Sequence, residues 1–123
     1  MLSVPGTVKI FLCLSPTDMR KSIDGLAGLV NSVLQEDPLS GHLFVFSGKR
    51  RDRVKLLYFD GDGYAVWYKR LELGVYRWPC GAAEQASVTL SAADLTMILS
   101  GVDLASVKRT KRYRKPETPV AAT

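Results

Sequence analysis

The chain has 123 residues, 46% of them hydrophobic, which is enough for one domain with a modest core and too apolar for a disordered chain. No apolar run reaches the roughly 18 residues of a membrane span, and the first 21 residues lack the basic start of a secretory signal. We therefore expect a cytoplasmic protein without a membrane partner. A net charge of +5 and a sequence pI near 9.4 indicate an anionic partner.

Metal-ligating residues are scarce in this sequence. It holds two cysteines, Cys13 and Cys80, and one histidine, His42. Two thiols in a cytoplasmic protein are expected to be free. A structural metal site needs four ligands at recognisable spacings, and these residues do not supply them. No metal and no cofactor are therefore expected.

The N-terminal third predicts a strand followed by a helix. Hydrophobic residues alternate over 7–15, as in a strand, before Pro16 interrupts the pattern. One long amphipathic helix is predicted over 18–36, with Thr17 as its N-cap and Asp37-Pro38 after its end. The predicted buried stripe of this helix is Met19, Ile23, Leu26, Val30, Val33 and Leu34.

The middle of the chain predicts further strands. The run at 42–48 is continuously apolar, as in a central strand, and strands at 54–60 and 63–70 are expected to form an antiparallel hairpin with a two-residue loop within "DGDG". Each possible loop places Leu57 with Val66 on one face and Leu56 with Trp67 on the other. "VYRW" at 75–78 is predicted as a short fifth strand.

Near the C-terminus, "VTL" resembles a strand and a short helix follows it, with Ser91 as N-cap and Gly101 as the terminating glycine. The predicted fold class is α+β: a mainly antiparallel sheet of four to five strands, one long helix packed on it and a short C-terminal helix. The predicted domain spans 1–106, and 107–123 is predicted to be a basic, disordered tail.

Two aspartates in the hairpin turn, Asp60 and Asp62, raise the alternative of a metal-dependent nuclease. Catalysis by divalent cations needs carboxylates that converge from several elements, and two aspartates supply only a fragment of such a site. Glu72 lies at the far end of the strand. The turn interpretation is therefore favoured, and no catalytic residue is predicted.

Ten of the 17 basic residues lie in two short segments, "KRRDR" at 49–53 and "KRTKRYRK" at 108–115. Arginine forks match phosphate oxygens, so both segments suit a nucleic-acid backbone, although a solvated turn or a tail for an acidic protein surface stays open. The predicted nucleic-acid-binding residues are Arg20, Lys21, Lys49, Arg50, Arg51, Arg53, Lys69, Arg70, Lys108, Arg109, Lys111, Arg112, Arg114 and Lys115.

"DMRKSIDGLAGLV" at 18–30 and "GHLFVFSGKRRDRVKLLYFDGDGYAVWYKRLELGVYRWP" at 41–79 resemble the small accessory proteins of bacterial insertion sequences of the sixty-six type, a family called TnpB or Orf2-like. The resemblance covers roughly residues 5–105. The positions that match the family pattern are Asp18, Arg20, Lys21, Asp24, Gly25, Arg50, Arg51, Arg53, Asp60, Gly61, Asp62, Gly63, Trp67, Lys69 and Arg70.

The resemblance implies a role in transposition beside a separate transposase, which carries the acidic catalytic residues. The expected partners are this transposase, other proteins encoded by the element, and DNA. The leading hypothesis is a non-catalytic accessory protein that binds DNA at the ends of the insertion sequence through its basic segments and assists the transposase. The alternative is a protein-interaction module that binds the transposase without touching DNA, through exposed aromatic residues of the hairpin.

Overall fold

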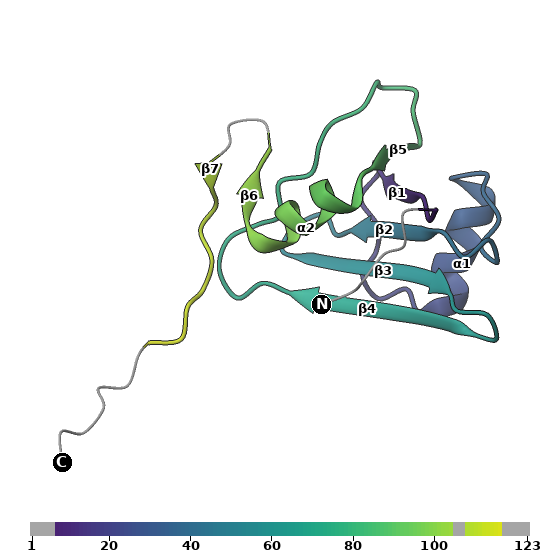
Figure 1. The fold of residues 1–123 in the computed structure, drawn as a ribbon, viewed down its shortest axis with the longest axis horizontal. Helices are drawn as coiled ribbons and strands as arrows, with labels where there is room; N and C mark the ends of the chain where they lie inside the picture. The colour runs from purple at the N-terminus through teal and green to yellow at the C-terminus, as the bar shows by residue number, and fades with distance from the viewer. Residues whose placement is uncertain (1–6, 105–107, 117–123) are drawn as a thin grey trace, which may run out of the picture.

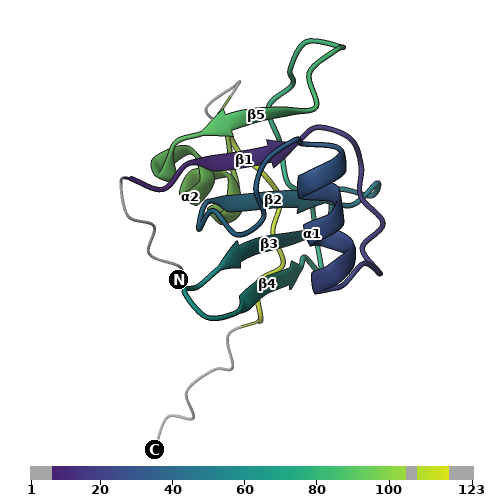
Figure 2. The ribbon, with the colours of Figure 1, turned by 90° about the vertical axis from the view of Figure 1, so that its right-hand side faces the viewer.

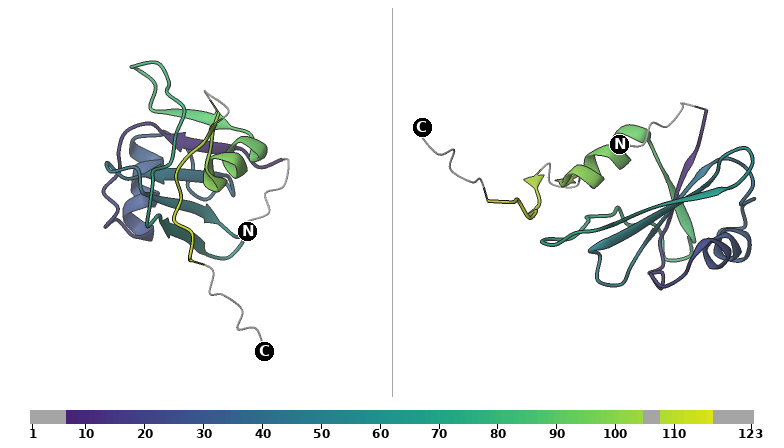
Figure 3. Two further views of the ribbon diagram at one scale, coloured as in Figure 1. Left: turned by 90° about the vertical axis from the view of Figure 1, so that its left-hand side faces the viewer. Right: turned by 90° about the horizontal axis from the view of Figure 1, so that it is seen from below.

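The computed structural model describes residues 7–104 and 108–116 and shows a five-stranded sheet with a helix on each face (Figures 1 and 3). Only the pair of β1 and β2 is parallel, and the other neighbours are antiparallel. The predicted α+β class and largely antiparallel sheet are confirmed. The strands, in spatial order, are β4 (Tyr64–Arg70), β3 (Arg53–Phe59), β2 (Leu43–Ser47), β1 (Ile10–Cys13) and β5 (Ser87–Leu90).

The two helices lie on opposite faces of the sheet (Figure 2). Helix α1 (Ile23–Ser32) connects the parallel strands β1 and β2, because a parallel pair needs a crossover connection. Leu26 and Val30 of α1 pack on the face that carries Phe44. Helix α2 (Ala92–Ser100) covers the other face. Strands β1 and β2 are therefore buried on both faces, which explains their nearly continuous apolar runs.

The prediction of one long helix over 18–36 is wrong, because α1 covers only Ile23–Ser32. At its start, the Thr17 N–H donates to the Ser47 carbonyl (2.8 Å), which holds the preceding segment against the end of β2. At its end, Gln35 adopts a left-handed φ of 54°, and the Glu36 N–H donates to the Val30 carbonyl. Glutamine rarely takes this conformation, so no local pattern marks this end of the helix.

The predicted hairpin of β3 and β4 is confirmed, together with its faces. Leu57 pairs with Val66, and Leu56 pairs with Trp67. The Asp60 N–H donates to the Gly63 carbonyl (2.7 Å), which leaves Gly61 and Asp62 as the two loop residues. Gly61 has a φ of 67°, the left-handed conformation that such turns require. The face with Trp67 packs against the α2 side of the core.

The predicted strand at 75–78 is wrong, since these residues belong to the connection between β4 and β5. The connection is still ordered by the core: Tyr76 is fully buried, and its N–H donates to the Arg51 carbonyl (2.7 Å). The fifth strand is β5, which contains the strand-like "VTL". The predicted cap of α2 is confirmed, because Ser91 accepts a hydrogen bond from the Asp94 N–H and Gly101 has a φ of 98°.

After α2, strands β6 (Val102–Asp103) and β7 (Lys108–Arg109) form a two-stranded antiparallel sheet. Residues 110–116 continue beyond the end of the main sheet (Figure 1). Two parts of the predicted domain division lie outside the described residues: the boundary at 106–107 and the end of the predicted tail at 117–123. The predicted disorder of the tail stays a prediction.

Candidate nucleic-acid interface

The basic loop between β2 and β3 has a defined shape because the core holds its backbone. The Arg51 N–H donates to the Gly48 carbonyl (3.0 Å), and Arg51 has a φ of 61°. The carbonyls of Arg51 and Asp52 accept hydrogen bonds from the N–H groups of Tyr76 and Leu71, both at 2.7 Å. Tyr76 and Leu71 are buried. These hydrogen bonds fix the backbone of the loop, so a ligand that bound there would cost it little conformational entropy.

A second loop, at 17–20, faces the basic loop. The Asp18 carboxylate accepts hydrogen bonds from the Arg20 backbone N–H (2.9 Å) and from its guanidinium Nη2 (2.8 Å). This arrangement holds the pKa of Asp18 well below its usual range, chiefly through the side-chain hydrogen bond from Arg20. The turn that replaces the first turns of the predicted helix is thus organised by one acid and one arginine.

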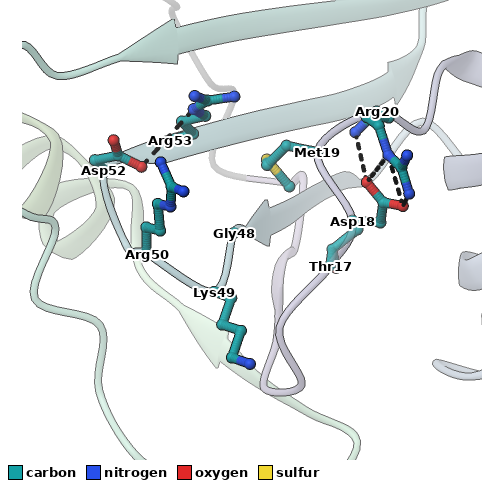
Figure 4. Close-up of a pocket in the computed structure, with 9 residues that line it drawn as sticks. All are labelled: Thr17, Asp18, Met19, Arg20, Gly48, Lys49, Arg50, Asp52 and Arg53. Atoms are coloured by element: carbon teal, nitrogen blue, oxygen red, sulfur yellow. Dashed lines mark hydrogen bonds and ion pairs between the residues drawn. The ribbon is translucent and has the colours of Figure 1, made fainter.

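The two loops form the walls of an open hollow of about 340 Å³ (Figure 4). The walls approach each other at Gly48, where a Cβ atom would lie 2.8 Å from Met19 Cγ. A larger residue at position 48 would therefore displace Met19. The hollow is lined by Thr17, Asp18, Met19, Arg20, Gly48, Lys49, Arg50, Asp52 and Arg53.

The hollow is positive, but less so than its cations alone suggest. Four cations and two aspartates line it, which leaves a formal charge of +2. Arg53 Nε lies 3.8 Å from Asp52 Oδ1, within ion-pair range, but this buried nitrogen makes no hydrogen bond within the described chain. Sequence reasoning missed Asp52 as a charge partner, although its place inside "KRRDR" was a signal.

Two more predicted cations extend the basic surface along the hairpin. Arg70 pairs across the strands with Arg53, and Lys69 pairs with Val54. Arg70 also forms an exposed ion pair with Glu72 (3.0 Å). Arg70 therefore lies on the same face of the sheet as Arg53, beside one wall of the hollow, whereas Lys69 points to the opposite face, which it shares with Val54.

Lys21 lies next to the second loop and is fixed there by a contact that the sequence analysis did not predict. The Lys55 ammonium donates to the Lys21 carbonyl (2.8 Å) and lies 4.9 Å from the centre of the Tyr68 ring. Lys55 therefore ties β3 and β4 to the chain just before α1. Its contacts hold this end of the sheet against the segment before α1.

The C-terminal basic residues differ in their surroundings. The Arg112 guanidinium donates to the Val75 carbonyl (3.1 Å) and to Thr110 Oγ1 (2.6 Å), and its Cζ lies 5.1 Å from the centre of the Tyr76 ring. Arg112 thus anchors the C-terminal segment to the core. Lys111, Arg114 and Lys115 are exposed, and Lys108 and Arg109 form β7.

Within the described ranges, no three His, Cys, Asp or Glu side chains lie together in a way that could hold a metal ion. Asp60 and Asp62 are exposed in the hairpin turn. Cys13 and Cys80 are both free thiols. Of the helices in residues 7–104 and 108–116, neither is long and apolar enough to cross a membrane.

The chain belongs to the family described as IS66 Orf2-like protein, whose profile matches residues 8–109. It is similar to two uncharacterized proteins of Sinorhizobium fredii (strain NBRC 101917 / NGR234), y4hO and y4jC. The identities are 36% and 34%, over 94% of this chain in each case and over 98% and 97% of the two relatives. No solved structure matches it. The suspected family resemblance is thereby confirmed, and the chain is an accessory protein of an insertion sequence.

Proposed function

We propose that this protein is a non-catalytic accessory factor of transposition that binds DNA at the ends of its insertion sequence and assists a separate transposase. The observation that carries the proposal is the hollow between the two loops. There Arg20, Lys49, Arg50 and Arg53 surround one space, and hydrogen bonds to the core hold the loop that carries three of them. Phosphate oxygens are the ligands that such guanidinium donors suit best.

The hollow is open and its cations are mostly exposed, which suits a phosphate backbone better than a small enclosed ligand. Arg70 extends the positive surface of the hollow along β4, and Lys69 adds an exposed cation on the other face of this strand. Exposed Lys111, Arg114 and Lys115 add charge beyond the end of the sheet. Contacts of this kind give affinity and steep salt dependence, whereas sequence selectivity needs contacts to base edges.

A matched pair of lysine substitutions tests the site. Lys49→Ala removes one cation from the hollow, and Lys9→Ala removes one exposed cation at the opposite end of the parallel strands. We expect Lys49→Ala to lower the slope of log K against log salt by roughly 0.9 for duplex DNA, and Lys9→Ala to leave it unchanged. Fluorescence anisotropy with the terminal DNA and a scrambled duplex over a salt series measures both quantities.

Equal effects of the two substitutions would show that DNA adheres through net charge alone. Absence of DNA binding at all salt concentrations would favour the alternative, a module that binds only the transposase. Preference for the terminal DNA at physiological salt, reduced by Lys49→Ala, would establish recognition of the element ends through this hollow.

A further inference from the structure

The outer edge of β4 is unpaired in the described chain, and its backbone groups are set for another strand. β4 is the last strand of the sheet on its side. The Asp60 N–H donates to the Gly63 carbonyl, so residues 65, 67 and 69 direct their backbone groups toward β3 and residues 64, 66, 68 and 70 direct theirs outward. The described C-terminal segment lies beyond the end of the sheet rather than along this edge (Figure 1).

This edge lacks the usual protection against pairing. Exposed edge strands commonly carry charges, prolines or bulges that prevent association. The first five residues of β4, "YAVWY", have none of these, and the pairing with β3 is regular along all seven residues. Tyr68, the last of these five residues, is 49% exposed. The other edge strand, β5, has only four residues.

The charges at the two ends of the hairpin are complementary to each other. Asp60 and Asp62 are exposed at the turn, and Lys69 and Arg70 are exposed at the other end of β4. An antiparallel neighbour with the same sequence would place its acidic turn beside the basic end of this strand. A two-fold axis would repeat the contact, as a closed dimer requires. An edge that is complementary to itself identifies a second copy of this chain as its partner.

We propose that two copies associate through antiparallel pairing of their β4 strands, which joins the two sheets into one. In the register that aligns the outward backbone groups and the charges, Val66 pairs with Val66 of the second copy, so the two-fold axis passes between these two residues. Tyr64 then faces Tyr68 of the second copy, and Asp62 faces Arg70. Aromatic and opposite-charge pairs of this kind stabilise antiparallel strands. Arg70 keeps donors for this contact besides those that bind Glu72.

A charge exchange tests this register in the absence of DNA. Asp62→Arg and Arg70→Asp each place like charges opposite one another twice per dimer, so each is expected to raise the dimer dissociation constant by about tenfold or more. The double variant restores the opposite charges and should recover most of the affinity. Sedimentation equilibrium, over about two decades of protein concentration up to roughly 0.1 mM, measures the dissociation constant. Glu84→Arg, an equal change of charge in the connection before β5, is the control and should leave the dimer intact.

A second variant tests the backbone pairing itself. Tyr68→Pro removes an outward N–H and leaves the bonds between β3 and β4 in place, and edge strands tolerate proline at such positions. Circular dichroism verifies that it is folded, and the expected result is a monomer. The proposal is overturned if the wild-type protein is monomeric throughout, or if a dimer forms that neither the charge exchange nor the proline alters. Because the assay contains no DNA, its outcome is independent of the proposed DNA binding.

Discussion

Tyr76 shows how one buried residue connects the basic loop with the C-terminal segment. Its backbone holds the Arg51 carbonyl, and its ring lies under the Arg112 guanidinium. Its hydroxyl is buried and makes no hydrogen bond with the described residues. Burial raises the pKa of Tyr76 to about 12, although Arg112 acts in the opposite direction.

Tyr76→Phe is expected to raise the free energy of unfolding by about 1 kcal/mol near neutral pH, because it removes an unpaired buried hydroxyl. The raised pKa adds a pH dependence. Its ordinary value is 10.0, so the folded state keeps the full benefit of the neutral ring below pH 10 and loses it as the pH rises toward about 12. Urea unfolding of both proteins at several pH values measures the effect. The gap between the variant and the wild type should widen above pH 10, and a constant gap would contradict this account.

Two glycines predict opposite effects of the same substitution. Gly74 has a φ of 85°, and a Cβ atom there would collide with the Lys111 carbonyl. Gly28 lies within α1, and a Cβ atom there would meet nothing within 4 Å. We expect Gly74→Ala to destabilise the fold by about 1–3 kcal/mol and Gly28→Ala to stabilise it by about 1 kcal/mol. Thermal unfolding of the two variants distinguishes these outcomes, and a neutral Gly74→Ala would mean that the C-terminal segment does not pack there in solution.

At the scale of elements, the C-terminal segment is held by few but specific contacts. The Thr110 N–H donates to the Gly101 carbonyl (2.7 Å), and Arg112 bridges the segment to the connection between β4 and β5. Arg112 was predicted to bind nucleic acid, and the structure gives its side chain an evident structural use as well. The structural role of Arg112 depends on where Tyr76 lies in space, and the local charge pattern does not predict that position.

Arg112→Lys is expected to lower the free energy of unfolding by about 1–2 kcal/mol, since a lysine ammonium cannot reproduce the planar fork or its place over the Tyr76 ring. Arg114→Lys at an exposed position is the matched control and should change stability by less than about 0.5 kcal/mol. Denaturant unfolding measures both. Equal stability of the two variants would show that the Arg112 contacts contribute nothing in solution.

Local signals predicted some elements well and others poorly. The hairpin faces and the capping of α2 follow from alternation, a Gly-Asp turn and a Ser–Gly pair of caps, and the structure agrees. The first turns of the predicted long helix failed because the Thr17 N–H is bound to β2, a contact between distant residues. The prediction of a strand at 75–78 failed because the segment is an irregular connection: Tyr76 is buried in the core, and its N–H bonds to the Arg51 carbonyl rather than to a neighbouring strand.

At the scale of the whole molecule, the sequence could not predict the order of the strands. The sequence pattern does not say which strands form the edges of the sheet. The structure places β1 between β2 and β5. The same limit applied to the site. The basic loop was evident as a cluster of charges, whereas its opposite wall at 17–20 was predicted to be helical. The hollow exists because the parallel arrangement of β1 and β2 brings the ends of both strands to the same side of the sheet.

The placement of β1 also has a consequence for synthesis of the protein on the ribosome. Ile10 pairs with Leu90, so β1 waits for its second neighbour until the long segment between the two strands has been made. Until residues 87–90 leave the exit tunnel, the apolar β1 edge is open and available for wrong pairing. The nascent chain therefore completes its main sheet only when β5 emerges and pairs with the exposed edge of β1.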